Sequence, residues 1–149
     1  MAHKHLFFLA LRAQHSLSKL GEKVFQKVLG VSAAHLSALF YLSRNDGCLL
    51  KDLSVGLELN NSAVTGLVRR MAAAGLVTRR SSATDGRAVH VNLTQKGRTI
   101  TEAADPVLNE INSLLTSDFS VTEMDTIIRF LGTIIAVREV EEGAFLESM

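Results

Sequence analysis

The hydrophobic period changes along this chain, and that change limits the folds open to it. Apolar residues recur every three or four positions over residues 6–28 and in later segments, a spacing typical of amphipathic helices. Over residues 88–93 apolar and polar residues alternate instead, and residues 76–80 form a second strand-like run. The Asp85-Gly86 pair between the two runs favours a tight reversal. The sequence therefore predicts a mainly α chain that carries one small β-hairpin.

Cap residues and turn signals divide the helical part of the chain. Ser, Thr and Asn side chains accept backbone N–H groups at helix starts, and glycine permits the left-handed conformation at helix ends. Pro106 lies inside the fifth expected helix and predicts a kink or a break there. The first expected helix covers residues 6–28 and is stopped by Gly30, and the second is capped by Ser32 and ends near Asn45-Asp46-Gly47. A short helix over 51–58 follows, and then one that is capped by Asn60-Asn61-Ser62 and runs through Ala74. The last two begin after Thr94 and at the capping box Ser120-Val121-Thr122-Glu123.

Length and composition exclude several classes of protein. A chain of 149 residues with 47% hydrophobic residues is expected to form one domain with a true core. The longest stretch without a charged residue, 28–43, is shorter than the roughly 20 apolar residues of a membrane span. With no signal-like N-terminus, we expect a cytoplasmic protein that has no membrane partner. The single cysteine, Cys48, excludes an internal disulfide framework and a Cys-rich zinc site.

The net charge of +1 conceals an uneven distribution of charge. Residues 1–59 carry +3, residues 60–98 carry +6 from seven cations and one acid, and residues 99–149 carry −8. A basic central block beside an acidic C-terminal segment is typical of a polyanion-binding element in a chain whose remainder has another role. The alternative is that the basic run is only a solvated surface.

The order helix, short helix, capped helix, hairpin is that of a winged helix-turn-helix, whose third element lies in the DNA major groove. On the helix that begins near residue 61, the apolar side leaves small polar or cationic residues pointing outward. Arg87 on the hairpin can enter the minor groove, and Arg70 fits backbone positioning or internal pairing. The residues expected to face DNA are Asn61, Ser62, Thr65, Arg69, Arg70 and Arg87.

The same region resembles a known family. Its segments, in this order and spacing, are similar to those of the MarR family of winged helix-turn-helix transcription regulators. The flanking long helices extend the resemblance over nearly the whole chain. The segments that carry it are the run from Leu53 to Met71, Gly75-Leu76-Val77, Asp85-Gly86-Arg87 and Leu93-Thr94-Gln95-Lys96-Gly97.

This resemblance implies a homodimer that binds a pseudo-palindromic operator in double-stranded DNA, in the manner of a repressor released by a ligand. Residues 1–149 would form a single MarR-like domain. Within it, 32–98 would be the DNA-binding lobe, and 1–30 and 99–149 the dimerisation helices.

The resemblance also assigns roles within the lobe. Thr65 and Arg70 match family positions on the recognition helix. Asp85 would brace the wing through an arginine, for which Arg70 is the candidate, and so leave Arg87 free for DNA. Gly66 stands where many members carry a long polar residue, and Arg69 where an acid is common. We therefore expect the readout to shift to Arg69.

By the same resemblance, a small phenolic or lipophilic effector would bind between the dimer helices and the DNA-binding lobe. Plain packing is the alternative role for each of the residues concerned. They are Phe8, Arg12, His15, His35 and Leu39.

Other functions have weaker signals in the sequence. The five histidines are spread over separate elements, which favours structural or surface roles over a metal site. No catalytic-triad, paired-carboxylate or phosphate-loop motif is present, so we expect neither an enzyme nor a cofactor. A redox- or metal-responsive regulator that uses Cys48 or the histidines stays open, as does a winged helix that docks proteins without binding DNA.

Overall fold

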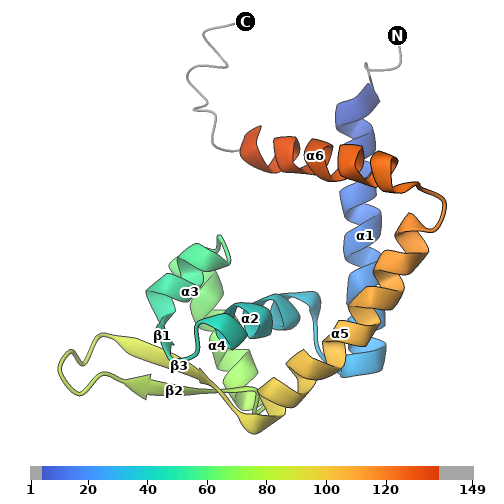
Figure 1. Ribbon diagram of the computed structural model, residues 1–149. Coiled ribbons are helices and arrows are strands. Elements are labelled where there is room, and N and C mark those ends of the chain that lie inside the picture. Colours follow the sequence, from blue (N-terminus) through green and yellow to red (C-terminus); the bar gives the residue numbers. More distant parts are fainter. Residues whose placement is uncertain (1–4, 138–149) are drawn as a thin grey trace, which may run out of the picture. The chain divides into compact units, whose positions relative to one another are not determined.

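The computed structural model describes residues 5–137, and within them it has six helices and one three-stranded antiparallel sheet (Figure 1). Residues 1–4 and 138–149 of the expected dimerisation segments lie outside the described residues. The elements are α1 (Leu6–Leu29), α2 (Ala33–Arg44), β1 (Cys48–Leu49), α3 (Leu50–Gly56), α4 (Asn61–Ala73), β2 (Val77–Ser81), β3 (Val89–Leu93), α5 (Gln95–Thr116) and α6 (Val121–Val137).

The chain divides into two compact units, Met1–Pro106 and Val107–Met149. The boundary falls inside α5, which continues through Pro106, so the helix does not break there. Proline has no N–H to donate to the carbonyl four residues earlier, and α5 tolerates that missing bond.

Four helices begin where the sequence predicts, because the predicted cap side chains take up backbone N–H groups left free at the helix starts. At the start of α6 the bonds are reciprocal, as a capping box requires. The capping bonds are His35 N–H to Ser32 Oγ (3.1 Å), Ala63 N–H to Asn60 Oδ1 (2.8 Å), Gly97 N–H to Thr94 Oγ1 (3.1 Å) and Ser120 N–H to Glu123 Oε2 (2.8 Å).

The sheet has the strand order β1-β3-β2, and its β2–β3 hairpin is the predicted one. The strand β1 was not predicted. It pairs with β3, so that Cys48 lies opposite Val91. The polar residues of the alternating run, His90 and Asn92, are half-buried, and His90 Nδ1 donates to Gly47 O at 2.9 Å.

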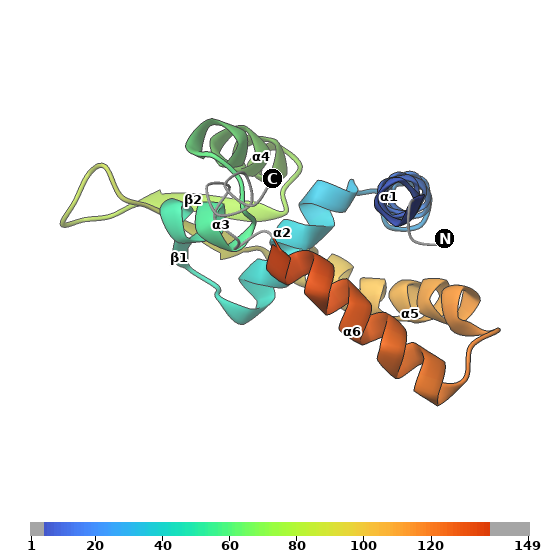
Figure 2. The ribbon, with the colours of Figure 1, turned by 90° about the horizontal axis from the view of Figure 1, so that it is seen from above.

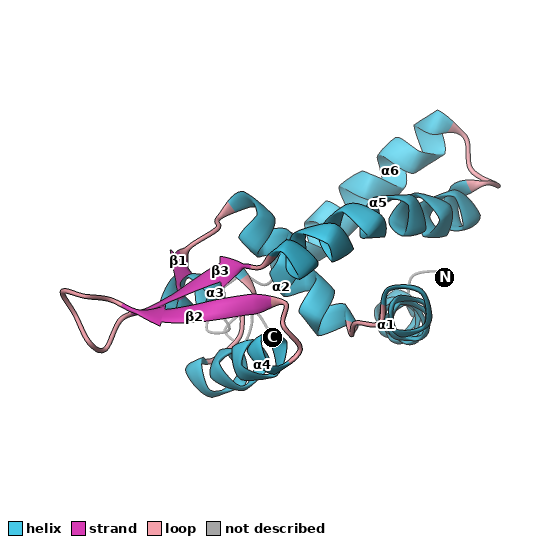
Figure 3. Ribbon diagram, turned by 90° about the horizontal axis from the view of Figure 1, so that it is seen from below, coloured by secondary structure: helices cyan, strands magenta, loops and turns pink. Residues whose placement is uncertain are grey.

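A single core holds the first unit together and fixes α4 against the sheet. Figures 2 and 3 show α4 beside β2. The first turn of α5 also approaches this core closely, because a Cβ at Gly97 would lie 2.3 Å from Leu76 O. The core side chains come from α2, α3, α4, β2, β3 and α5, and the largest are Leu39, Leu42, Leu53, Val64, Val68, Met71, Leu76 and Val91.

Two helices, α1 and α6, bury no residue within the described part of the chain. Their apolar side chains are largely exposed, which is unusual for a stable surface in water. The most exposed of them are Phe7, Phe8, Leu9, Leu11 and Val28 on α1 and Val121, Ile128, Leu131, Ile135 and Val137 on α6.

Candidate nucleic-acid interface

One side of α4 is fixed in the core, and its other side faces outward. Val64, Leu67, Val68 and Met71 are at most 2% exposed, as the periodicity predicts. Because these residues recur every three or four positions, the remaining face projects from the unit. That face carries Asn61, Ser62, Arg69 and Arg70, which are exposed, and Thr65, which is half-buried.

The wing turn is shaped by short-range hydrogen bonds. Arg87 N–H donates to Asp85 Oδ1 at 3.0 Å, and Ala88 N–H donates to Asp85 O at 2.9 Å. Ser82 N–H closes the hairpin by donating to Ala88 O at 2.8 Å. An aspartate that accepts a backbone N–H two residues ahead forms an Asx turn. Asp85 therefore braces the wing through the backbone and leaves the Arg87 guanidinium exposed.

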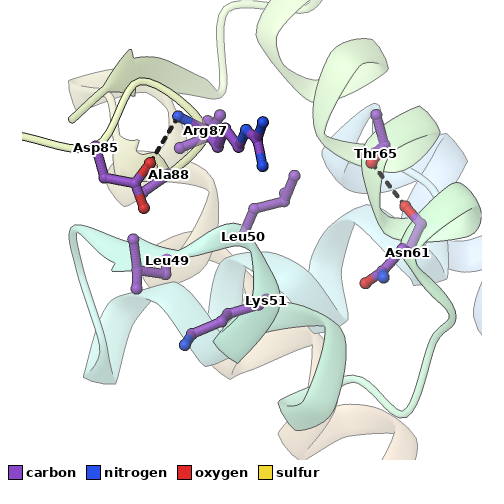
Figure 4. Close-up of a pocket in the computed structure, with 9 residues that line it drawn as sticks. Leu49, Leu50, Lys51, Asn61, Thr65, Asp85, Arg87 and Ala88 are labelled. Atoms are coloured by element: carbon purple, nitrogen blue, oxygen red, sulfur yellow. Dashed lines mark hydrogen bonds between the residues drawn. The ribbon is translucent and has the colours of Figure 1, made fainter.

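A cavity of about 320 Å³ lies between the wing, α3 and α4 (Figure 4). Arg87 extends over Leu50 toward the side formed by Asn61 and Thr65. The Thr65 hydroxyl donates to Asn61 O at 2.6 Å, so its own proton is occupied within the helix. The lining residues are Leu49, Leu50, Lys51, Asn61, Thr65, Asp85, Arg87, Ala88 and Val89.

This cavity brings together four of the predicted site residues, Asn61, Thr65, Asp85 and Arg87. It also contains Lys51, which sequence reasoning missed. A lone lysine in the first turn of a short helix has no pattern that separates it from any solvated lysine. Only the fold shows that Lys51 lines the same cavity as Arg87.

Arg70 has neighbours other than the predicted one. Its Nη1 lies 3.3 Å from the place where a Cβ on Gly66 would stand, so the side chain covers the bare position one helical turn back. Within residues 5–137 no ion pair joins Arg70 to Asp85. Burial lowers the pKa of His35, the Arg70 charge lowers it further, and Glu22 partly opposes both.

The exposed arginines of this surface keep their charge available. Among the described residues, ion pairing is limited to Arg98 with Asp46, which leaves the wing and α4 arginines without a carboxylate partner. Cations without internal partners suit contact with phosphate. They are Arg69 and Arg70 on α4, Arg79 and Arg80 on β2, and Arg87 on the wing.

The predicted effector residues differ in their surroundings within the described part of the chain. Leu39 is fully buried in the core, whereas Phe8 is 62% exposed and Arg12 and His15 are exposed on α1. His35 lines a second cavity, of about 340 Å³. The other residues that line it are Gln26, Leu29, Gly30, Val31, Ser32, Ala74, Leu76, Lys96 and Ile100.

We searched the described residues for a metal site, a reactive thiol and a membrane-spanning helix. No group of three or more His, Cys, Asp or Glu side chains among them is placed to hold a metal ion. Burial raises the pKa of the half-buried Cys48 thiol, and the Asp52 charge raises it further, which disfavours the reactive thiolate. None of the described helices is long and apolar enough to cross a membrane.

These features define a winged helix-turn-helix of the DNA-binding class. They are a capped helix with a polar outer face, a shorter helix before it, and a hairpin with an exposed arginine. The helix-turn-helix consists of α3 and α4, and β2 and β3 form the wing.

Comparison with known proteins supports this class. The family model described as MarR family matches residues 29–88. The organic hydroperoxide resistance transcriptional regulator of Bacillus subtilis (strain 168) is 28% identical over 99 residues, which are 66% of this chain and 67% of that protein. The S. aureus MepR–DNA complex has a TM-score of 0.78 at 21% identity and covers 87% of this chain and 95% of its own. Bordetella bronchiseptica BpsR, whose DNA binding is regulated by 6-hydroxynicotinic acid, has a TM-score of 0.73 at 23% identity, covering 88% and 98%.

The chain is thus similar to the MarR family over residues 29–88, and its fold is that of the winged helix-turn-helix structures it resembles. The two curated relatives are both described as transcriptional regulators.

Proposed function

We propose that this protein is a homodimeric repressor that binds a pseudo-palindromic operator and is released from it by a small ligand. One observation on residues 5–137 carries the proposal: α1 and α6 leave their apolar faces uncovered, while α4 and the wing present cations without carboxylate partners. The uncovered apolar faces require another surface to pack against, and the cations suit contact with a polyanion. As a DNA-binding regulator it would act in the cytoplasm.

The DNA contacts follow from the exposure of each residue. Asn61, Ser62 and Thr65 lie at the start of α4, the end of a recognition helix that meets base edges. Arg69 is one turn further along and can bind guanine through two hydrogen bonds. Arg87 would meet the minor groove or its phosphates, with Arg70 and Lys51 on the backbone.

The dimer would form through residues 1–30 and 99–149, with 32–98 as the DNA-binding lobe of one MarR-like domain. A second copy offers the same apolar faces, so a two-fold contact is self-complementary. Such a dimer places its two recognition helices about 34–36 Å apart, one turn of DNA.

The effector would be a small lipophilic or phenolic molecule. His35 and the cavity that it lines are the part of the predicted pocket that one chain forms by itself. Phe8, Arg12 and His15 on α1 would join the pocket only with the dimer in place. The half-buried Cys48, with its raised pKa, disfavours the redox alternative.

Binding-site selection from random duplexes with the purified protein tests the proposal. We expect an enriched site with two inverted half-sites whose centres are about 10 base pairs apart. Sedimentation at the same protein concentration should give the mass of a dimer. Selection of no motif, or of a single half-site by a monomer, contradicts the proposal.

A further inference from the structure

The carboxylate of Asp46 joins three segments that are far apart in the sequence. Asp46 lies in the turn between α2 and β1. Its Oδ1 accepts a hydrogen bond from Leu93 N–H at 2.8 Å, and its Oδ2 pairs with the Arg98 guanidinium. Leu93 ends β3, the second strand of the wing, and Arg98 lies in the first turn of α5. One side chain thus ties the base of the wing to the turn after α2 and to α5.

The contact between Asp46 and Leu93 continues the pairing of β1 with β3 beyond Cys48, the first residue of β1. The register pairs Leu49 with His90 and Cys48 with Val91, so the position that faces Leu93 is residue 46. There the Asp46 side chain accepts the Leu93 N–H and extends the ladder by one hydrogen bond beyond the two-residue strand.

The base of the wing is held on its other side as well. The Thr94 hydroxyl lies 2.6 Å from Gly75 O and 3.0 Å from Leu76 O, at the turn that leads into β2. Thr94 therefore anchors the hairpin to the end of α4, and Asp46 anchors it to the turn after α2.

A small rotation at the base of the wing becomes a larger displacement at Arg87. Six residues separate Leu93 from Arg87, which is about 20 Å at roughly 3.3 Å per strand residue. A tilt of a few degrees about Leu93 therefore moves Arg87 by more than about 1 Å. A charged hydrogen bond to phosphate is weakened by such a displacement.

We propose that Asp46 is a positioning residue for DNA binding, which holds the end of β3 so that Arg87 meets the phosphate backbone. The inference rests on the proposed DNA contact of Arg87. Asp46 itself touches no DNA in this scheme, since a carboxylate near phosphate is repelled.

The sign of the effect separates positioning from simple charge. Removing Asp46 takes away a negative charge and frees the Arg98 guanidinium from its partner. Both changes, acting through charge alone, strengthen DNA binding and steepen its dependence on salt. Weaker binding with a shallower salt dependence therefore requires that a cation elsewhere in the chain no longer meets its phosphate.

The test measures the affinity of the full chain for a fluorescent 30-base-pair duplex of mixed sequence over a series of KCl concentrations. The variants are Asp46→Ala, Arg87→Ala, the double variant, and Asp105→Ala as a control that removes one exposed acid from α5. We expect Asp46→Ala and Arg87→Ala each to lower the log–log slope by about 0.9 for each phosphate that the protein no longer neutralises. The double variant should lower it no further, and Asp105→Ala should not lower it at all.

Two different failures are distinguishable. A lower slope for Arg87→Ala with an unchanged or steeper slope for Asp46→Ala overturns the role of Asp46 alone. An unchanged slope for Arg87→Ala removes the wing from the proposed function and overturns the role of Asp46 with it. If circular dichroism shows that Asp46→Ala is unfolded, Asp46→Ser against Asp105→Ser decides by the same criterion, because the single, shorter hydroxyl of serine cannot hold both Leu93 N–H and Arg98 as the carboxylate does.

Discussion

Asp85 accepts the backbone N–H of Arg87 at 3.0 Å, so the residue that shapes the wing turn is two positions from the residue proposed to contact DNA. The bond needs an oxygen at Asp85, but it does not need a charge. Bracing through the backbone and bracing through an ion pair with Arg70 therefore differ in what they predict for a neutral replacement.

Replacing Asp85 separates these two kinds of bracing. Asparagine keeps an oxygen acceptor for the Arg87 N–H, and alanine does not. We expect Asp85→Asn to bind duplex DNA at least as tightly as the wild type, and Asp85→Ala to bind several-fold more weakly. Fluorescence anisotropy at one fixed salt concentration measures both. Equal reductions in affinity for the two variants support the ion pair with Arg70 instead.

Arg69 is proposed to read bases, so its removal should change sequence preference more than overall affinity. A good bidentate contact to guanine discriminates by about 1–3 kcal/mol. Arg69→Ala should therefore lose its preference at one position of each half-site in a selection experiment. Arg129→Ala, which removes an exposed cation from α6, is the matched control and should select the wild-type site. If Arg69→Ala selects the wild-type motif, a residue other than Arg69 reads that base.

Gly97 permits the close approach of α5 to the start of β2. A Cβ there would lie 2.3 Å from Leu76 O, a backbone atom that cannot move aside cheaply. Gly97→Ala should destabilise the chain by about 1–3 kcal/mol, as overpacking does. Gly132→Ala is the control, because its Cβ meets nothing within 4 Å and a helical alanine gains about 0.5–1 kcal/mol over glycine. Thermal unfolding that ranks the two variants in the opposite order contradicts this packing.

Asp46 gives the fold an acid-sensitive contribution to stability. Burial alone would raise the pKa of this carboxyl, but the Leu93 N–H and the Arg98 guanidinium outweigh burial and hold the pKa below its ordinary value. The stabilisation is therefore complete above the unfolded value of about 3.9 and is lost as pH falls through the lower folded value.

Urea unfolding of the wild type and Asp46→Asn measures this contribution. The difference between their free energies of unfolding should be constant above about pH 5 and should shrink below about pH 4. A difference that stays constant down to about pH 2, or that grows in acid, is inconsistent with the lowered pKa.

The apolar face of α6 should be needed for assembly. Ile135 is 74% exposed in the single chain, and a charge there would have to be desolvated in a dimer contact. We expect Ile135→Asp to shift sedimentation toward the monomer and to weaken operator binding. Thr133→Asp adds the same charge at another exposed position of α6 and tests whether the effect depends on the apolar side chain. A dimer that survives Ile135→Asp excludes this face from the contact.

Local signals in the sequence predict much of the fold. Ser32 and Asn60 mark the starts of α2 and α4 because a cap acts within three residues of its own position. The buried side of α4 follows from its period in the same way. The two-residue strand β1 has no period of its own, and its pairing with β3 depends on residues more than 40 positions away.

In the candidate site too, local signals predict some residues, whereas others depend on long-range packing. Asn61, Thr65 and Arg87 are found from helix position and turn chemistry, and the fold places them around one cavity. The place of Lys51 in that cavity and the cover of Arg70 over Gly66 depend on how elements and side chains pack, which no spacing along the chain encodes. The effector pocket is the least predictable part, because Leu39 is needed by the core itself.

The one helix shared by both compact units, α5, has a mechanical consequence. A loop at the boundary would let the winged unit turn freely, whereas a continuous helix transmits torsion from one end to the other. Pro106 removes one backbone hydrogen bond at that boundary, so bending there costs less than in the turns on either side. In the proposed dimer, the span between the two half-sites would depend on how easily α5 bends, and Pro106 is the residue that sets this.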